Sequence, residues 1–156
     1  MTEAEIAARL HAAGIVLPEP AAPVASYLPT VEAAGLLHVS GQLPFVDGKL
    51  VTGRLGEDIS LQAGTQAARA CAIMILAQAQ AALGSLARIE RVVKLGAFVS
   101  STADFTDQPK VANGASDLMA QILGDAGRHA RSAVGVPVLP LGAAVEVDAL
   151  LLIARD

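Results

Sequence analysis

The stretches Ala144–Ala154 (AVEVDALLLIA) and Arg91–Val99 (RVVKLGAFV) decide the fold, because both are apolar or β-branched runs with few polar positions. We expect strands at Val145–Ile153 and Ile89–Val99. If helices cover only one face of a sheet built from such strands, its other face stays apolar. An exposed apolar face usually has a partner, and symmetric self-association is the commonest way to bury it. We therefore expect a homo-oligomer.

Two long helices flank the Ile89–Val99 strand in the sequence. The first is expected over Leu61–Leu83, with Asp58 or Ser60 as its N-cap and Gly84 as its C-cap. The second begins at Pro109, which suits a first helical turn, and runs to about Leu123. The remaining strands are expected at Val24–Leu28, Leu36–Gln42, Phe45–Thr52 folded about Asp47–Gly48, and Ala130–Val136, with a turn at Pro140–Gly142 before the last strand.

The first 23 residues carry an extra helix and a connector. Thr2 and Glu5 form a capping box for a short helix that runs to about Ala13 and ends at Gly14. The proline-rich Leu17–Pro23 (LPEPAAP) is expected to be an extended connector. With 156 residues, against roughly 150 per domain, the chain 1–156 is expected to be one domain, a two-layer α+β sandwich with a mixed sheet.

Composition excludes several classes of protein. The chain is 53% hydrophobic and 17% charged, which rules out a disordered protein. Its longest apolar runs are shorter than the roughly 20 residues of a membrane helix, and its acidic start does not resemble a signal peptide, so we expect a cytoplasmic protein without membrane contact. A net charge of -4 and 3% aromatic residues disfavour nucleic-acid binding. One cysteine and three scattered histidines indicate no disulfide and no metal site.

Arg131 stands out because it interrupts an otherwise apolar strand, Ala130–Val136. A guanidinium in such surroundings needs an anionic partner, and its planar fork fits a carboxylate through two parallel hydrogen bonds. The partner is either a bound ligand or an acidic side chain of the protein in an ion pair. The sequence favours the ion pair slightly and leaves both interpretations open.

Glu146 and Asp148 alternate with valines, so both carboxylates share one face of their strand. In a cleft, burial and mutual repulsion would raise the pKa of at least one of them, which suits proton transfer. On a solvent-facing surface they are ordinary acids, and the alternation alone favours that second interpretation.

Other polar or reactive residues give weaker signals. Ser40 shares a strand face with His38, but no acid is placed to complete a catalytic triad, and Gly41 does not open a helix. Tyr27, the one tyrosine, is expected to pack with its hydroxyl at the surface. Cys71 lies on the apolar stripe of the first long helix and is expected to be buried and inert.

The order and spacing of several motifs resemble the RidA (YjgF) family of reactive-intermediate deaminases, from about Val24 to Ala154. The motifs are Tyr27 ahead of a long strand, Val39–Pro44 (VSGQLP), Leu55–Gly56, Ala130–Ser132 (ARS), Leu139–Pro140 and Val145–Ala149 (VEVDA). Each alone is weak, and their order and spacing together are specific.

This resemblance implies a chorismate-mutase-like α+β fold and a homotrimer with ligand sites between subunits. It implies hydrolysis of 2-aminoacrylate and related 2-imino or 2-enamino acids to 2-keto acids and ammonia, with no cofactor. Arg131 would then bind the substrate carboxylate and Glu146 would hold or activate a water. The pocket would also include Tyr27, Ser40, Ala133 and Asn113.

The sequence also departs from the family pattern. Ala133 stands where the family commonly has a cysteine, and extra residues after Phe105 leave open whether Asn113 or Ser116 fills the family's asparagine position. These departures and the added N-terminal helix indicate a divergent subgroup. Two other functions remain open: a non-catalytic trimer that binds small carboxylates or acts as a chaperone, and an endoribonuclease or translation inhibitor, which the acidic charge disfavours.

Overall fold

The computed structural model describes residues 1–20 and 26–154. Its main elements, in chain order, are α1 (Glu3–Ala12), β1 (Thr30–Ala33), β2 (Leu36–Gln42), β3 (Phe45–Val46), β4 (Lys49–Leu50), α2 (Leu61–Leu83), β5 (Ile89–Ser100), α3 (Gln108–Leu123), β6 (Ala130–Val136) and β7 (Val145–Ile153). Three short 3-10 helices lie at Leu86–Arg88, Gly124–Gly127 and Pro140–Gly142.

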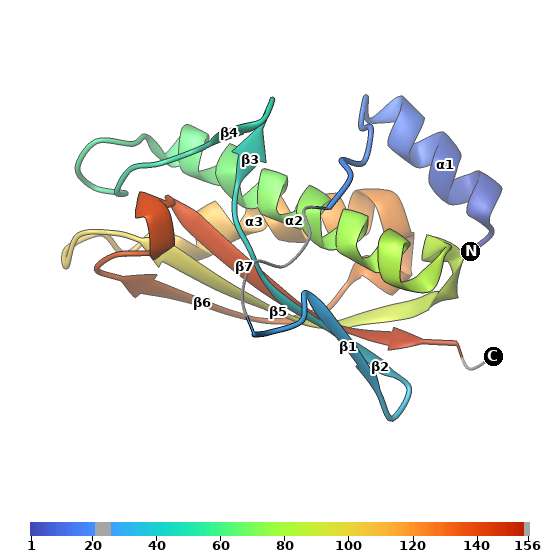
Figure 1. Ribbon diagram of the computed structural model, residues 1–156. Helices are drawn as coiled ribbons and strands as arrows, with labels where there is room; N and C mark the ends of the chain where they lie inside the picture. The colour runs from blue at the N-terminus through green and yellow to red at the C-terminus, as the bar shows by residue number, and fades with distance from the viewer. Residues whose placement is uncertain (21–25, 155–156) are drawn as a thin grey trace.

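Five strands form a mixed sheet in the order β1-β2-β7-β5-β6, in which β5 and β6 are parallel and the other neighbours are antiparallel. The helices α2 and α3 lie side by side on one face of this sheet, and α1 lies on the same side (Figure 1). The hairpin β3–β4 is a separate two-stranded sheet. The predicted two-layer α+β plan with a mixed sheet is therefore confirmed.

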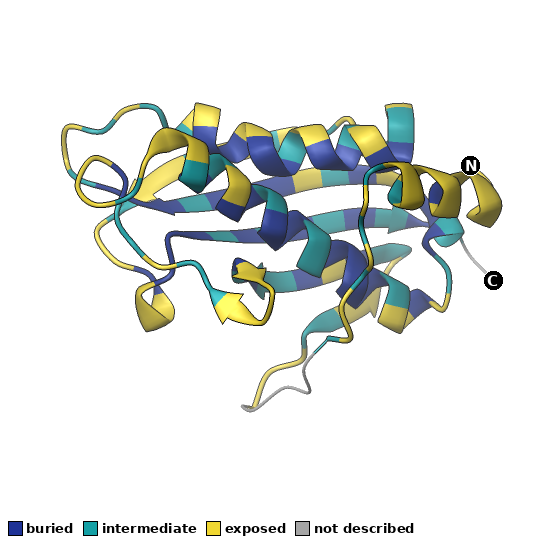
Figure 2. Ribbon diagram, turned by 90° about the horizontal axis from the view of Figure 1, so that it is seen from above, coloured by how far each residue is buried: buried dark blue, intermediate teal, exposed yellow. Residues whose placement is uncertain are grey.

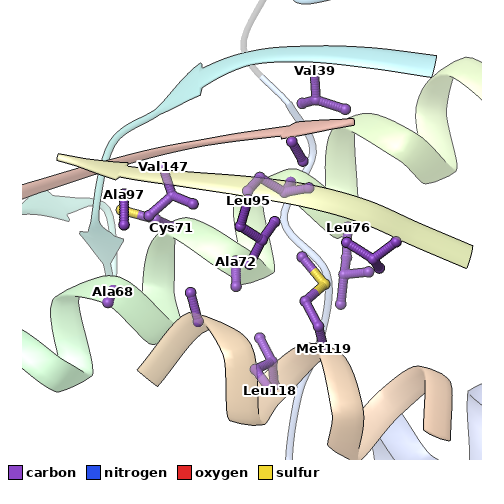
Figure 3. Packing of buried hydrophobic residues seen from close by; sticks show 14 of the residues in the cluster. Val39, Ala68, Cys71, Ala72, Leu76, Leu95, Ala97, Leu118, Met119 and Val147 are labelled. Carbon is purple, nitrogen blue, oxygen red and sulfur yellow. The ribbon is translucent and has the colours of Figure 1, made fainter. Parts of the chain in front are cut away.

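The core lies between the sheet and the two long helices. Small side chains such as Ala68 and Ala72 of α2 let the helix approach the strands that carry Leu95 and Val147 (Figure 3). The helices show dark blue where they face the sheet and yellow on their outer surfaces, whereas α1 is mostly exposed and buries only Ile6 (Figure 2). Cys71 is buried in this core, as predicted.

The helix boundaries follow the predicted caps. Ser60, not Asp58, caps α2, and Gly84 ends it in the left-handed conformation. The Asp58 carboxylate accepts a hydrogen bond from the Arg54 amide instead. The capping box between Thr2 and Glu5 is present at the start of α1.

The first strand lies later than predicted. Part of the expected Val24–Leu28 strand falls outside the described residues, and residues 26–28 form no strand. The chain pairs instead at Thr30–Ala33, because Ala34 and Gly35 both take positive φ values, 54° and 79°, and form a two-residue hairpin turn into β2. Pro29 precedes this hairpin and has no amide proton to donate to a strand.

The uncovered face of the sheet is more polar than expected. A hollow of about 690 Å³ on this face includes apolar Phe98, Val134 and Leu150. The same hollow includes the polar side chains His38, Ser40, Lys94, Ser132 and Asp148. The expectation that this face stays apolar therefore holds only in part, because several outward-facing residues of these strands are polar.

Candidate functional site

Arg131 extends from β6 toward α3, on the helix-covered side of the sheet. Its Nη1 donates to Asn113 Oδ1 at 2.9 Å and to Ser116 Oγ at 3.0 Å, and its Nη2 donates to the Pro109 carbonyl oxygen at 3.2 Å. The three acceptors are four and three residues apart, so they form one stripe along a single face of the helix. Both candidates for the family's asparagine position, Asn113 and Ser116, contact the arginine.

These contacts leave one edge of the guanidinium available. A guanidinium carries five N–H donors, and three of them point to α3. One donor on Nε and one on Nη2 remain, and a carboxylate can accept from such a pair side-on. Within residues 1–20 and 26–154, no acidic side chain forms an ion pair with Arg131. A hollow of about 590 Å³ lies beside it, lined also by Ser116, Arg128 and His129.

His129 belongs to this cluster, although the sequence analysis did not select it. Its Nε2 lies 2.9 Å from Ser116 Oγ, and its Nδ1 lies 2.6 Å from the Gly127 carbonyl oxygen. The sequence signal that could have identified His129 is its position two residues before Arg131, since alternate residues of an extended chain point the same way. The hydrogen-bond partners of His129 lie in α3 and in the Gly124–Gly127 turn.

Glu146 and Asp148 share the uncovered face of β7, as the alternation predicts. The Glu146 carboxylate lies against Gly41 of β2, where an added Cβ would overlap it. Burial, followed by the Asp148 carboxylate, raises the pKa of Glu146 above its ordinary value. A carboxyl group with a raised pKa is a stronger base than an ordinary carboxylate, which suits a group that accepts and returns a proton.

Asp148 is held in place by Gly96 of β5. Its Oδ1 accepts a hydrogen bond from the Gly96 amide at 3.1 Å, and a Cβ on Gly96 would meet this carboxylate. Burial raises the pKa of Asp148, while the Gly96 hydrogen bond and the Lys94 charge oppose that shift. Asp148 therefore acts on Glu146 through its charge and is itself fixed to the neighbouring strand.

The remaining predicted residues divide between the two sides. Ser40 Oγ donates to the Leu28 carbonyl oxygen at 2.8 Å, which fastens the segment that carries Tyr27 beside β2. The Tyr27 side chain is 57% exposed. Ala133 lies on the same side of β6 as Arg131 and packs partly against the core.

Strand register places Arg131 and Glu146 on opposite faces of the sheet. Arg131 pairs with Leu95, a buried residue under the helices, whereas Glu146 pairs with Phe98 on the uncovered face. Because the sheet lies between them, one chain does not bring the cation and the acid together. The predicted residues form two half-sites, one with Arg131, Asn113 and Ala133 and the other with Glu146 and Ser40.

The described parts of the chain contain neither a metal-ligand cluster nor a membrane-spanning helix. There, no group of three or more histidine, cysteine or acidic side chains is arranged to hold a metal ion. No described helix has both the length and the apolar character that a bilayer crossing requires. Burial, followed by the Glu146 charge, raises the pKa of the Cys71 thiol, so the thiolate is strongly disfavoured.

Comparisons with known proteins agree with one another. Residues 7–152 match the family described as "YjgF/chorismate mutase-like, putative endoribonuclease". Protein TCP17 of Trypanosoma cruzi is 55% identical over 148 residues, covering 94% of this chain and 92% of that protein. The crystal structure of Atu1372 from Agrobacterium tumefaciens, a protein with unknown function, is 47% identical and superimposes with a TM-score of 0.92, covering 97% and 94% of the two chains. The structure of RidA from the Antarctic bacterium Psychrobacter sp. is 29% identical with a TM-score of 0.60, covering 86% and 94%.

Proposed function

Because this chain belongs to the YjgF/RidA-like family and has its chorismate-mutase-like fold, we propose that it is a cofactor-independent hydrolytic deaminase. Its substrates would be 2-aminoacrylate and related 2-imino or 2-enamino acids, and its products 2-keto acids and ammonia. The observation that carries this proposal is that Arg131 lines a hollow, keeps two guanidinium donors beyond its contacts with α3, and forms no ion pair with a described acid.

The reaction needs one cation to bind substrate and one acid to move protons. Arg131 binds the substrate carboxylate through Nε and Nη2, which orients the imine carbon. Glu146 accepts a proton from water as the water oxygen bonds to that carbon, and it passes this proton to the imine nitrogen to give a carbinolamine. The carbinolamine hydroxyl then transfers its proton through Glu146 to the amino group, the C–N bond breaks, and ammonia leaves as the keto group forms. The raised pKa of Glu146 favours both proton transfers.

The opposite placement of Arg131 and Glu146 supports an assembly in which the active site lies between two chains. In the proposed homotrimer, each ligand site lies at a subunit interface, where Arg131 of one chain faces Glu146 of the next. The edge position of β6 and the hollow on the uncovered face are both compatible with such packing. The expected assembly is thus part of the catalytic proposal, because one chain supplies only half of the chemistry.

The direct test is ammonia release from freshly generated 2-aminoacrylate. Arg131→Ala should lower the rate by about 100-fold or more, since a buried charge-assisted bidentate contact is lost. Arg131→Lys keeps the charge but loses the planar fork, so its rate should lie between those of the wild type and Arg131→Ala. A wild-type rate in Arg131→Ala would exclude the proposed role, and a wild-type protein no faster than buffer would exclude the activity itself.

A second candidate is a non-catalytic protein that binds small carboxylates. It is favoured by one observation: the Arg131 half-site is fully organised by α3 without any contribution from Glu146. It predicts that a 2-keto acid binds to Arg131 while imine hydrolysis stays at the buffer rate. The endoribonuclease function named in the family description is tested separately by salt-dependent RNA binding, which the net charge of -4 disfavours.

A further inference from the structure

A chain of hydrogen-bonded polar groups lies behind Arg131. It runs from the Gly127 carbonyl oxygen through His129 and Ser116 to the guanidinium, with contacts of 2.6, 2.9 and 3.0 Å. We propose that Ser116 and His129 are positioning residues that hold Arg131 in its carboxylate-binding orientation. This inference rests on the proposed carboxylate-binding role of Arg131.

With a neutral imidazole, the direction of each hydrogen bond in this chain follows from its partners. A carbonyl oxygen only accepts, so His129 Nδ1 carries a proton and donates it to Gly127. In a neutral imidazole the other nitrogen, Nε2, is then an acceptor, and the Ser116 hydroxyl donates to it. The Ser116 oxygen keeps its lone pairs for the Arg131 Nη1 donor. Ser116 thus acts as a fixed acceptor whose hydroxyl cannot rotate toward the arginine.

The backbone geometry keeps this chain in place. Gly127 packs against the main chain of α3 so closely that an added Cβ would overlap the Met119 carbonyl oxygen. On its other side α3 is held by Gly114, where a Cβ would overlap the Thr65 carbonyl oxygen of α2. The helix that carries Ser116 and the turn that carries Gly127 are therefore fixed relative to one another.

Fixing the guanidinium has a consequence for binding. An arginine side chain has many rotamers, and a ligand that must order it loses affinity. The contacts to Ser116 and Asn113 order it before a ligand arrives and leave the Nε donor and one Nη2 donor for that ligand. Positions 116 and 129 should therefore change affinity for a carboxylate and KM more than they change kcat.

Paired variants separate this role from simple packing. Ser116→Ala removes the acceptor in a position where alanine favours the helix, and Ser116→Thr keeps an Oγ. His129→Asn keeps a donor near Gly127 but does not reach Ser116, whereas His129→Gln extends far enough to accept from Ser116. Binding of 2-oxobutanoate should weaken about tenfold in Ser116→Ala and His129→Asn and stay within about threefold in Ser116→Thr and His129→Gln.

The positioning role can also be tested without a ligand, so this test does not depend on the proposed deaminase function. Nitrogen-15 NMR should show separate, slowly exchanging Arg131 Nη signals in the wild type. These signals should merge in Ser116→Ala and His129→Asn, as expected for the exposed control Arg128, whose partner Asp125 is 96% exposed. If the Arg131 signals of both variants match the wild type, the positioning role is excluded, whatever the deaminase assay gives. Unchanged NMR signals with lost imine hydrolysis would contradict this inference while leaving the proposed function standing.

Discussion

The two faces of the sheet differ in the surroundings that they give to a charged side chain. On the covered side, Arg131 is surrounded by neutral acceptors from one helix, and its charge is oriented without being cancelled. On the uncovered side, Glu146 lies in the space left by Gly41, where burial and then the charge of Asp148 raise its pKa. One face thus presents an oriented cation, and the other a carboxyl group with a raised pKa.

The separation of these groups has a chemical consequence. If Glu146 lay beside Arg131 in the same chain, the two would form an ion pair, which would lower the pKa of Glu146 and occupy the guanidinium. With the sheet between them, no such pair forms within one chain, and at the proposed interface it is the substrate carboxylate that occupies the arginine. The proposed reaction then requires a second chain to bring an acid to each arginine.

The largest effect that separates the two faces is expected from Glu146→Gln. Loss of the proton acceptor should lower kcat by about 100-fold, while 2-oxobutanoate should still bind to Arg131 within about twofold. Because the ionised carboxylate is disfavoured in the folded state, the variant should also melt at a higher temperature at neutral pH. Steady-state kinetics, calorimetry and thermal melts check the three expectations, with Glu90→Gln on an exposed position as control. An unchanged kcat would remove Glu146 from the mechanism.

A smaller effect is expected from the two glycines that face the acids. Gly41→Ala should displace the Glu146 carboxylate and lower kcat about tenfold, because proton transfer depends on its position. Gly96→Ala is the matched control, since its methyl group presses on Asp148 instead. Equal losses of kcat in both variants, measured alongside their melting temperatures, would show that Glu146 has no special role.

The smallest effect is a change in pH dependence in Asp148→Asn. Glu146 must be ionised to accept a proton from water, so the rate falls as the pH decreases through its raised pKa. Removing the Asp148 charge takes away one cause of that raised value. The acid limb of the kcat profile should therefore move to lower pH, with the rate at pH 8 within about twofold of wild type. A shift toward higher pH would contradict this coupling between the two acids.

Much of the fold follows from local sequence signals. The ends of α2 follow from Ser60 and Gly84, and β2, β6 and β7 begin and end where their apolar alternation predicts. The first strand was misplaced because its boundary depends on an Ala34–Gly35 turn, and alanine seldom adopts the positive φ that this turn requires. The polarity of the uncovered face depends on which strands become neighbours, which no single segment encodes.

The candidate site was predictable residue by residue but not as an arrangement. Arg131 is conspicuous because a charge in an apolar strand needs a partner. The opposite orientation of Glu146 depends on the register of β6, β5 and β7, which is a long-range property. His129 was missed because one of its partners is a backbone carbonyl oxygen, and residue types do not show which carbonyl groups a side chain will contact.

The central claim is that each active site takes Arg131 from one chain and Glu146 from another. Arg131→Ala and Glu146→Gln chains, each inactive alone, should be refolded together and their mixing confirmed by native mass spectrometry. In a ring of randomly mixed subunits, about a quarter of the sites combine an intact arginine with an intact glutamate, so about a quarter of the wild-type deaminase rate should return. Mixed oligomers that remain as inactive as the separate variants would contradict the account.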